Sequence, residues 1–221
     1  MQPAGARDVF GRSLRLLARN PALVVPGLVS GALAAIAIAI LAPAQPLDSN
    51  LFTRLLQSCA QLLAAIVAIA YTTGMADAAW RDGRARFSDG ARAFRRDAAH
   101  VLLALLFLFA FGVMAALAAP FTLWFSFAIY AFFGLYAMAA AVVGERPGFF
   151  ALRESVEIAF ARPVMTLVVV AGIVAICALA AIVAELLAAT PPAGPLVSGA
   201  VVAGALAYLT LVVVGEYRAS R

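Results

Sequence analysis

Lysine is absent from the 221 residues, and charged residues of either sign make up only 12% of the chain. A soluble domain carries about 25% charged residues, because most of its exterior contacts water. Hydrophobic residues reach 65% here, against roughly 45 to 50% in such a domain. An ordinary soluble globule is therefore excluded, since it would lack polar side chains to cover its surface. We predict an all-α, polytopic membrane protein, with residues 1–221 forming one domain.

Residues that carry chemistry are also scarce. Cys59 and Cys177 lie in separate apolar runs without CxxC spacing, and His100 is the only histidine. This set is too small for a zinc or redox centre. The sequence has neither a Gly-x-Ser-x-Gly nucleophile motif nor a Gly-rich phosphate loop. We therefore expect no cofactor, no bound metal and no enzymatic activity.

One acidic stretch is similar in composition to the metal-binding motif of CDP-alcohol phosphotransferases, Asp-x-x-Asp-Gly-x-x-Ala-Arg. Here the pair Ala85-Arg86 follows Asp82-Gly83 one residue too early, and Ala79 occupies the first acidic position. Carboxylates must converge on one point to hold a metal ion, and these offsets do not allow it. The spacing therefore favours a solvated basic loop with scattered acids.

Long apolar segments dominate the rest of the chain. A membrane span needs about 20 mostly apolar residues, and it must be helical so that its backbone groups are satisfied internally. Six segments meet this requirement, at about 22–42, 55–76, 98–119, 121–143, 163–189 and 196–215. The sequence therefore predicts six transmembrane helices.

The distribution of arginine predicts the orientation of these spans. All sixteen basic residues are arginines, and the net charge is +5. If both termini are cytoplasmic, fifteen arginines lie on the inside and only Arg54 lies outside. The positive-inside rule therefore predicts that both termini lie in the cytoplasm. Because the arginines are spread over four segments, nucleic acid is not an expected partner.

A threefold internal repeat organises the spans, with units at about 8–77, 87–143 and 149–215. Ser13 precedes Pro21 by eight residues, and Ser155 precedes Pro163 by eight residues. A degenerate middle copy begins at Phe87 and lacks the proline. Each unit reads as a cytoplasmic amphipathic helix followed by a helical hairpin, and the three hairpins are expected to be related by a pseudo-threefold axis along the membrane normal.

The amphipathic segments carry most of the predicted lipid contacts. Basic residues at helical spacing oppose an apolar stripe, which is typical of a helix lying in the headgroup layer. We expect anionic headgroups to bind six arginines, namely Arg12, Arg15, Arg19, Arg92, Arg95 and Arg96. The alternative is that these segments are cytoplasmic extensions of the spans.

These features resemble a group of bacterial inner-membrane proteins that includes the YciC-type family and the membrane domain attached to some glycerophosphodiester phosphodiesterases. The resemblance rests on the opening Phe-Gly-Arg-Ser-Leu-Arg-Leu-Leu-Ala-Arg-Asn-Pro and on Gly-Glu-Arg-Pro-Gly at 144–148 with Ala-Leu-Arg-Glu-Ser at 151–155. It implies a six-helix membrane module and supplies no catalytic residues.

Few polar residues fall inside the predicted spans. Glu185 lies near the outer end of the fifth span, and Arg54, Gln57 and Gln61 lie at similar depth in the second. An acid at this depth is a functional candidate, but Arg54 offers it a structural partner. Gly27 and Gly31 form a GxxxG pattern, which allows close packing between helices of the same chain.

Two functions remain open at this point. The first is a non-enzymatic membrane module, a scaffold or accessory subunit that packs against lipid or partner membrane proteins. The second is a carrier for a lipidic or weakly polar solute that passes between the hairpins. A central cavity lined by Gln61, Ser126, Tyr130 and Glu185 would favour the carrier.

Overall fold

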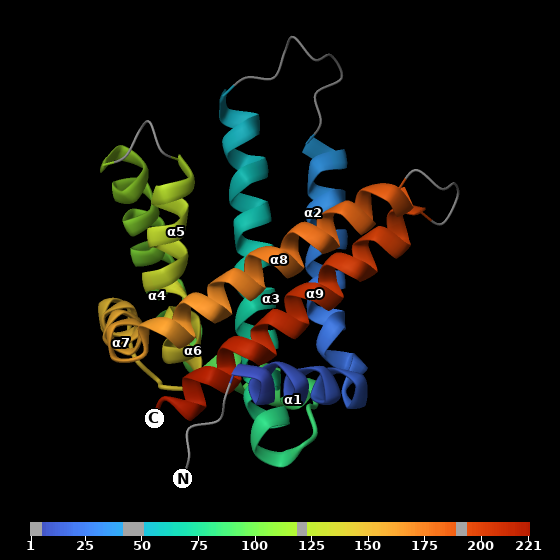
Figure 1. Ribbon diagram of the computed structural model, residues 1–221. Helices are drawn as coiled ribbons and strands as arrows, with labels where there is room; N and C mark the ends of the chain where they lie inside the picture. Colours follow the sequence, from blue (N-terminus) through green and yellow to red (C-terminus); the bar gives the residue numbers. More distant parts are fainter. Residues whose placement is uncertain (1–5, 42–50, 119–122, 189–193) are drawn as a thin grey trace.

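The protein is described by a computed structural model that covers residues 6–41, 51–118, 123–188 and 194–221. Helices form all the regular secondary structure in these ranges, which confirms the all-α prediction for them (Figure 1). In chain order they are α1 (Ala6–Arg19), the 3-10 helix η1 (Pro21–Val24), α2 (Val25–Leu41), α3 (Leu51–Asp82), α4 (Phe87–Ala118), α5 (Leu123–Gly134), α6 (Ala137–Val142), α7 (Phe149–Ala161), α8 (Pro163–Ala188) and α9 (Gly194–Ala219).

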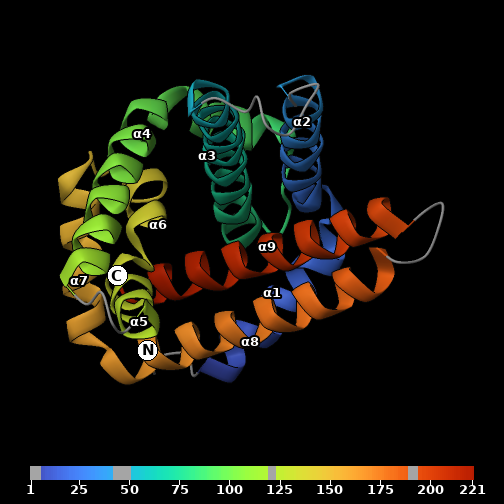
Figure 2. The ribbon, with the colours of Figure 1, turned by 90° about the horizontal axis from the view of Figure 1, so that it is seen from above.

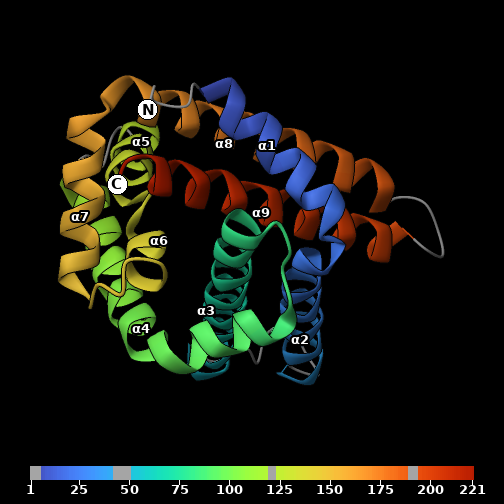
Figure 3. The ribbon, with the colours of Figure 1, turned by 90° about the horizontal axis from the view of Figure 1, so that it is seen from below.

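The first amphipathic segment is a separate helix. Helix α1 ends at Arg19, and a bend of 96° separates it from the apolar helix that follows. Pro21 suits the start of the next helix because it has no N–H to leave unpaired there. Seen from below, α1 lies across the hairpin of α8 and α9 (Figure 3). Its apolar side chains therefore pack against the C-terminal hairpin.

The second amphipathic segment differs from the prediction. Helix α4 runs unbroken from Phe87 to Ala118, so residues 87–97 are its first turns and not a separate helix. This matches the alternative in which the segment is an extension of the following helix, and its cytoplasmic location stays a prediction. The physical reason is that Ala98 replaces the proline that ends the first segment before α2 and the third before α8. The third segment, α7, is again separate and stops at Arg162, before Pro163.

The fourth predicted span, 121–143, is divided between helices α5 and α6. The helix breaks at Leu135 and Tyr136, and Ser155 of α7 satisfies the freed backbone groups. Its hydroxyl donates to the carbonyl oxygen of Phe133 at 2.6 Å and accepts from the N–H of Tyr136 at 3.0 Å. A residue from another helix thus stabilises the break.

The hairpins are not parallel to one another. Helices α2 and α3 stand side by side, whereas α8 and α9 cross them obliquely (Figures 1 and 2). Helix α9 packs against α1, α2 and α3, so the last helix of the chain contacts the first three α-helices. Three parallel hairpins around one axis, as the repeat predicts, are not seen in the described part of the chain.

Two described helical stretches are long and apolar enough to cross a membrane, Pro163–Leu187 and Val197–Ala219. A third is added if the bent pair Asp8–Arg19 and Pro21–Leu33 counts as one span, and Ile129–Val142 is apolar but shorter. These helices are compatible with a membrane location. The count of six spans stays a prediction, because 42–50, 119–122 and 189–193, which hold most of the predicted outer connections, lie outside the described residues.

The main core lies at the end of the molecule that carries most of the arginines. Met75, Tyr136, Leu211 and Tyr217 are fully buried there, where α3, α6, α7 and α9 meet. Alanine lines much of α6 in this core, which lets neighbouring helices approach closely. The packed end holds α2 and α3 at the position where an apolar cavity forms.

Candidate functional site

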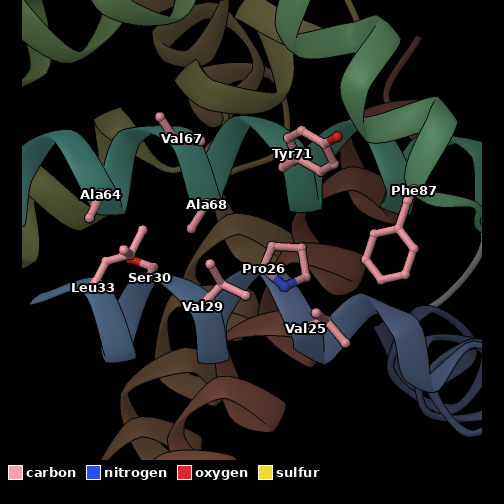
Figure 4. Close-up of a pocket in the computed structure, with 10 residues that line it drawn as sticks. All are labelled: Val25, Pro26, Val29, Ser30, Leu33, Ala64, Val67, Ala68, Tyr71 and Phe87. Atoms are coloured by element: carbon pink, nitrogen blue, oxygen red, sulfur yellow. The ribbon is translucent and has the colours of Figure 1, made fainter. Parts of the chain in front are cut away.

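An apolar cavity of about 520 Å³ opens between α2 and α3 (Figure 4). We call it the α2–α3 cavity. Its walls come from Val25, Pro26, Val29, Ser30 and Leu33 of α2, Ala64, Val67, Ala68 and Tyr71 of α3, and Phe87 of α4. The alanines of α3 leave space that larger side chains would fill. The cavity is therefore an apolar cleft, and among its described lining residues the polar side-chain groups are the hydroxyls of Ser30 and Tyr71.

A second cavity, of about 410 Å³, lies between α2, α3 and α9. Ser30 and Ala68 line both cavities, so only small side chains separate them. At the wall of the second cavity α2 and α9 meet closely, because a Cβ atom on Gly27 would lie 3.1 Å from Cβ of Ala203. Around Gly31, its own helix backbone apart, no atom of the described residues lies within 4 Å of the corresponding position. Of the two predicted packing glycines, Gly27 thus lies at a close helix contact and Gly31 borders open space.

The loop between α3 and α4 is anchored beside the α2–α3 cavity. Asn20, at the bend after α1, donates to the carbonyl oxygen of Gly83 at 3.3 Å and accepts from the N–H of Ala85 at 2.7 Å. Gly83 has φ of +74°, a left-handed conformation that glycine adopts without strain. The loop leads directly into Phe87, which lines the cavity. This places the loop residues 83–86, which we call the basic loop, at one end of the cavity.

Arg84 and Arg86 of the basic loop are exposed. Neither guanidinium forms a hydrogen bond or an ion pair within the described ranges, and the same holds for Arg19 next to Asn20. Asp82, just before the basic loop, is already paired with Arg81, whose Nε lies 3.1 Å from Oδ1 of Asp82. That hydrogen bond lowers the pKa of Asp82 and keeps its carboxylate charged. The basic loop therefore presents guanidinium groups that no carboxylate of the described chain neutralises.

Several other arginines at this end join neighbouring elements of the fold. Arg218 pairs with Asp77, joining α9 to α3. Three more ion pairs join neighbouring elements, Arg146 with Glu154 at 2.9 Å, Arg162 with Glu216 at 2.6 Å and Arg96 with Glu145 at 2.8 Å. The charges of these guanidinium groups are already balanced by carboxylates of the chain. The pairing thus separates structural arginines from those that face outward.

Trp80 joins three helices at the same end. The guanidinium of Arg12 lies 4.6 Å from the Trp80 ring centre, a cation–π contact between α1 and α3. The indole N–H donates to the carbonyl oxygen of Leu211 in α9 at 2.8 Å. Arg12 therefore has a structural contact that Arg15 and Arg19 lack. Sequence reasoning did not single out Trp80, because its partners are far away in the chain.

The six arginines predicted to contact anionic lipid are all exposed. Arg12, Arg15 and Arg19 lie on α1, and Arg92, Arg95 and Arg96 on the first turns of α4. Arg92 lies 3.8 Å from the Asp89 carboxylate, and Arg96 binds the buried Asp97 carboxylate at 2.9 Å. This hydrogen bond raises the pKa of Arg96. Contact of these residues with lipid stays a prediction.

The intramembrane polar candidates are only partly described. Glu185 is exposed on α8, near the end of that helix. The side chains of Arg54, Gln57 and Gln61 lie outside the described part of the structure, so pairing of Glu185 with Arg54 stays a prediction. Tyr130 lines a cavity of about 140 Å³ between α5 and α8.

One buried acid escaped the sequence analysis. Glu216 in α9 is fully buried; its Oε1 accepts from Arg162, while Oε2 has no hydrogen-bond partner among the described residues. Next to it, the Tyr217 hydroxyl donates to Glu154 of α7 at 2.7 Å. The available signal was an acid preceded by a continuous apolar helix.

Within the described residues, no group of three or more His, Cys, Asp or Glu side chains is placed to hold a metal ion. Comparison of the chain with protein-family models, curated proteins and solved structures finds no match.

Proposed function

We propose that the protein is a non-enzymatic integral membrane module of the bacterial inner membrane, with both termini in the cytoplasm. In this proposal it acts as a scaffold or accessory subunit that packs against lipid and partner membrane proteins. The observation that carries the proposal is the unpartnered apolar face of α8. The resemblance of the sequence to the YciC-type group, a six-helix membrane module, points the same way.

Of the two membrane-compatible stretches, the one in α8 is the more apolar and the less covered. Only 11% of its membrane-compatible stretch is buried, against 33% for the stretch in α9. The side chains that face outward are large and aliphatic, including Val164, Leu167, Leu179, Ile182 and Leu186. Monomeric soluble proteins rarely expose a continuous apolar surface of this length. Lipid tails or another apolar helix would cover it without loss of hydrogen bonds.

Site-specific photocrosslinking in native membranes tests this proposal. A photoreactive residue at the exposed Leu179 should cross-link to lipid or to a neighbouring membrane protein. The adjacent Ala180, which is buried, is the matched control and should give only cross-links within the chain. Equal, purely internal cross-linking at both positions would show that α8 is covered by the protein itself and would contradict the proposal.

The carrier remains the second candidate, and one observation favours it. The α2–α3 cavity and the cavity beside α9 are separated by the small side chains Ser30 and Ala68. A lipidic solute would need only modest movement of α2 against α3 to pass between them. Such a path would run between the first hairpin and α9.

A lipid-translocation assay tests the carrier. In proteoliposomes with fluorescent phospholipid, a carrier should accelerate loss of inner-leaflet fluorescence to a membrane-impermeant quencher, relative to protein-free vesicles. Ser30→Phe, which fills the boundary between the cavities, should abolish the acceleration, and Gly31→Ala, at a position with open space, should not. If the wild-type protein gives no acceleration, the carrier is contradicted and only the scaffold proposal remains.

A further inference from the structure

We propose that the α2–α3 cavity and the basic loop together bind one anionic phospholipid. In this site an acyl chain lies in the cavity, and the headgroup phosphate is held by Arg84 and Arg86. The inference rests on the proposed membrane location, and it adds a defined ligand and site to it.

The cavity has the properties that an acyl chain requires. Its volume of about 520 Å³ falls within the range of about 300 to 1,000 Å³ that is typical of small-ligand sites. Val25, Val29 and Leu33 are all partly exposed along its open side, so the apolar wall is not covered by another element. A flexible hydrocarbon chain fills such a cleft without leaving a polar group unpaired.

The basic loop has the properties that the headgroup requires. Arg84 and Arg86 lack carboxylate partners in the described chain, and guanidinium groups bind phosphate through paired hydrogen bonds. The nearest acids are otherwise engaged, Asp82 with Arg81 and Asp89 with the backbone N–H of Arg86. Charge complementarity therefore selects an anionic lipid over a neutral one.

The two halves of the site are held at a fixed separation. Asn20 binds the backbone at Gly83 and Ala85, so the bend before α2 and the basic loop are held together. Phe87 follows Arg86 directly and lines the cavity (Figure 4). An aromatic residue between charged and apolar regions is typical of a membrane interface. The geometry thus matches the order of a phospholipid, with the charged group at one end and the chain beyond it.

Native mass spectrometry of the full chain in mild detergent tests the headgroup half. Dioleoylphosphatidylglycerol should bind more tightly than dioleoylphosphatidylcholine. Arg84→Gln/Arg86→Gln should weaken phosphatidylglycerol binding about 25-fold, taking about fivefold for each charge. The same variant should weaken phosphatidylcholine binding less, because the choline ammonium group already offsets the charge of that phosphate. Arg153→Gln is the matched control, an exposed arginine on α7 that lines neither half of the site, and should change binding less than twofold.

Filling the cavity tests the acyl-chain half. Val29→Trp should weaken binding of both lipids, and Leu33→Trp is a second variant in case the first fails to fold, as judged by helicity and thermal unfolding. A phosphatidylglycerol with a photoreactive acyl chain should label residues 25–33 and 64–71 in the wild-type protein. Labelling mainly elsewhere would overturn the proposal. So would a loss of binding in the arginine variant that is not accompanied by a loss in the tryptophan variants. Cross-linking at Leu179 does not involve this cavity. A failure of the proposed membrane function is therefore distinguishable from a failure of the lipid site.

Discussion

At the residue scale, the arginines divide into two functional groups that the sequence alone does not separate. Arg162 and Arg218 bind carboxylates of other helices, whereas Arg84 and Arg86 bind none in the described chain. A paired guanidinium stabilises the fold, because removing it leaves a carboxylate without compensation. An exposed unpaired one contributes little to folding and remains available to an anion.

The pair of Arg162 and Glu216 provides a sharp test of this division. Arg162→Gln should lower stability in detergent by about 3 to 5 kcal/mol, because it leaves the fully buried Glu216 carboxylate unpaired. Glu216→Gln should cost less, since a neutral amide replaces the buried charge and Arg162 retains some access to water. In thermal or denaturant unfolding, the double variant should lose less than the sum of the single variants.

An exposed pair in the neighbouring helix is the control. Arg153 and Glu157 lie one helical turn apart on α7, with side chains that are 63% and 59% exposed. Arg153→Gln should change stability by no more than about 1 kcal/mol, because water screens such pairs. Equal losses at Arg153 and Arg162, or additive losses at Arg162 and Glu216, would contradict a structural role for the buried pair.

At the scale of elements, proline decides where amphipathic segments separate from the spans. The first and third segments stop before Pro21 and Pro163, and the proline-free second one continues into α4. The break between α5 and α6 has another cause, because Ser155 satisfies its backbone groups from α7. Local sequence thus controls two of the breaks, and packing between elements controls the third.

Two glycines of α9 should respond to alanine in opposite directions. A Cβ on Gly215 would overlap with Cζ2 of Trp80 and lie 2.6 Å from Cε2, whereas no atom lies within 4 Å of the same position at Gly204. Gly215→Ala should displace the indole from Leu211 and lower the melting temperature in detergent. Gly204→Ala should raise it slightly, by up to about 1 kcal/mol in stability, because alanine favours a helix over glycine. Equal shifts in the two variants would show that Trp80 does not hold α9 in place.

At the scale of the whole molecule, the predicted topology places both termini and the arginine-rich loops in the cytoplasm. Ser88 and Glu157 are exposed and suit single-cysteine labelling, whereas Ser155 is fully buried and does not. In a variant with Cys59 and Cys177 replaced, cysteines at either site should resist a membrane-impermeant reagent in intact cells. They should react after the cells are opened. Labelling of either site in intact cells would reverse the orientation.

The sequence by itself determined the helical class, the membrane-compatible apolar helices and the separate helices α1 and α7. These properties depend on composition, periodicity and proline, which act over a few residues. Pro21 and Pro163 are sufficient to predict where those helices end. The arginine pattern likewise predicts an orientation without knowledge of the tertiary structure.

Only the tertiary structure decided which polar residues meet. Asn20 binds the backbone at Ala85, Trp80 binds Leu211, and Arg162 binds Glu216, each across more than fifty positions of the chain. The oblique crossing of α9 over α2, and the cavities beside it, depend on close packing of small side chains such as Gly27 against Ala203. In a chain so rich in alanine, many different close contacts between helices are compatible with the same pattern of apolar residues. The physical reason is that apolar periodicity specifies which face of a helix is buried, but not which helix covers it.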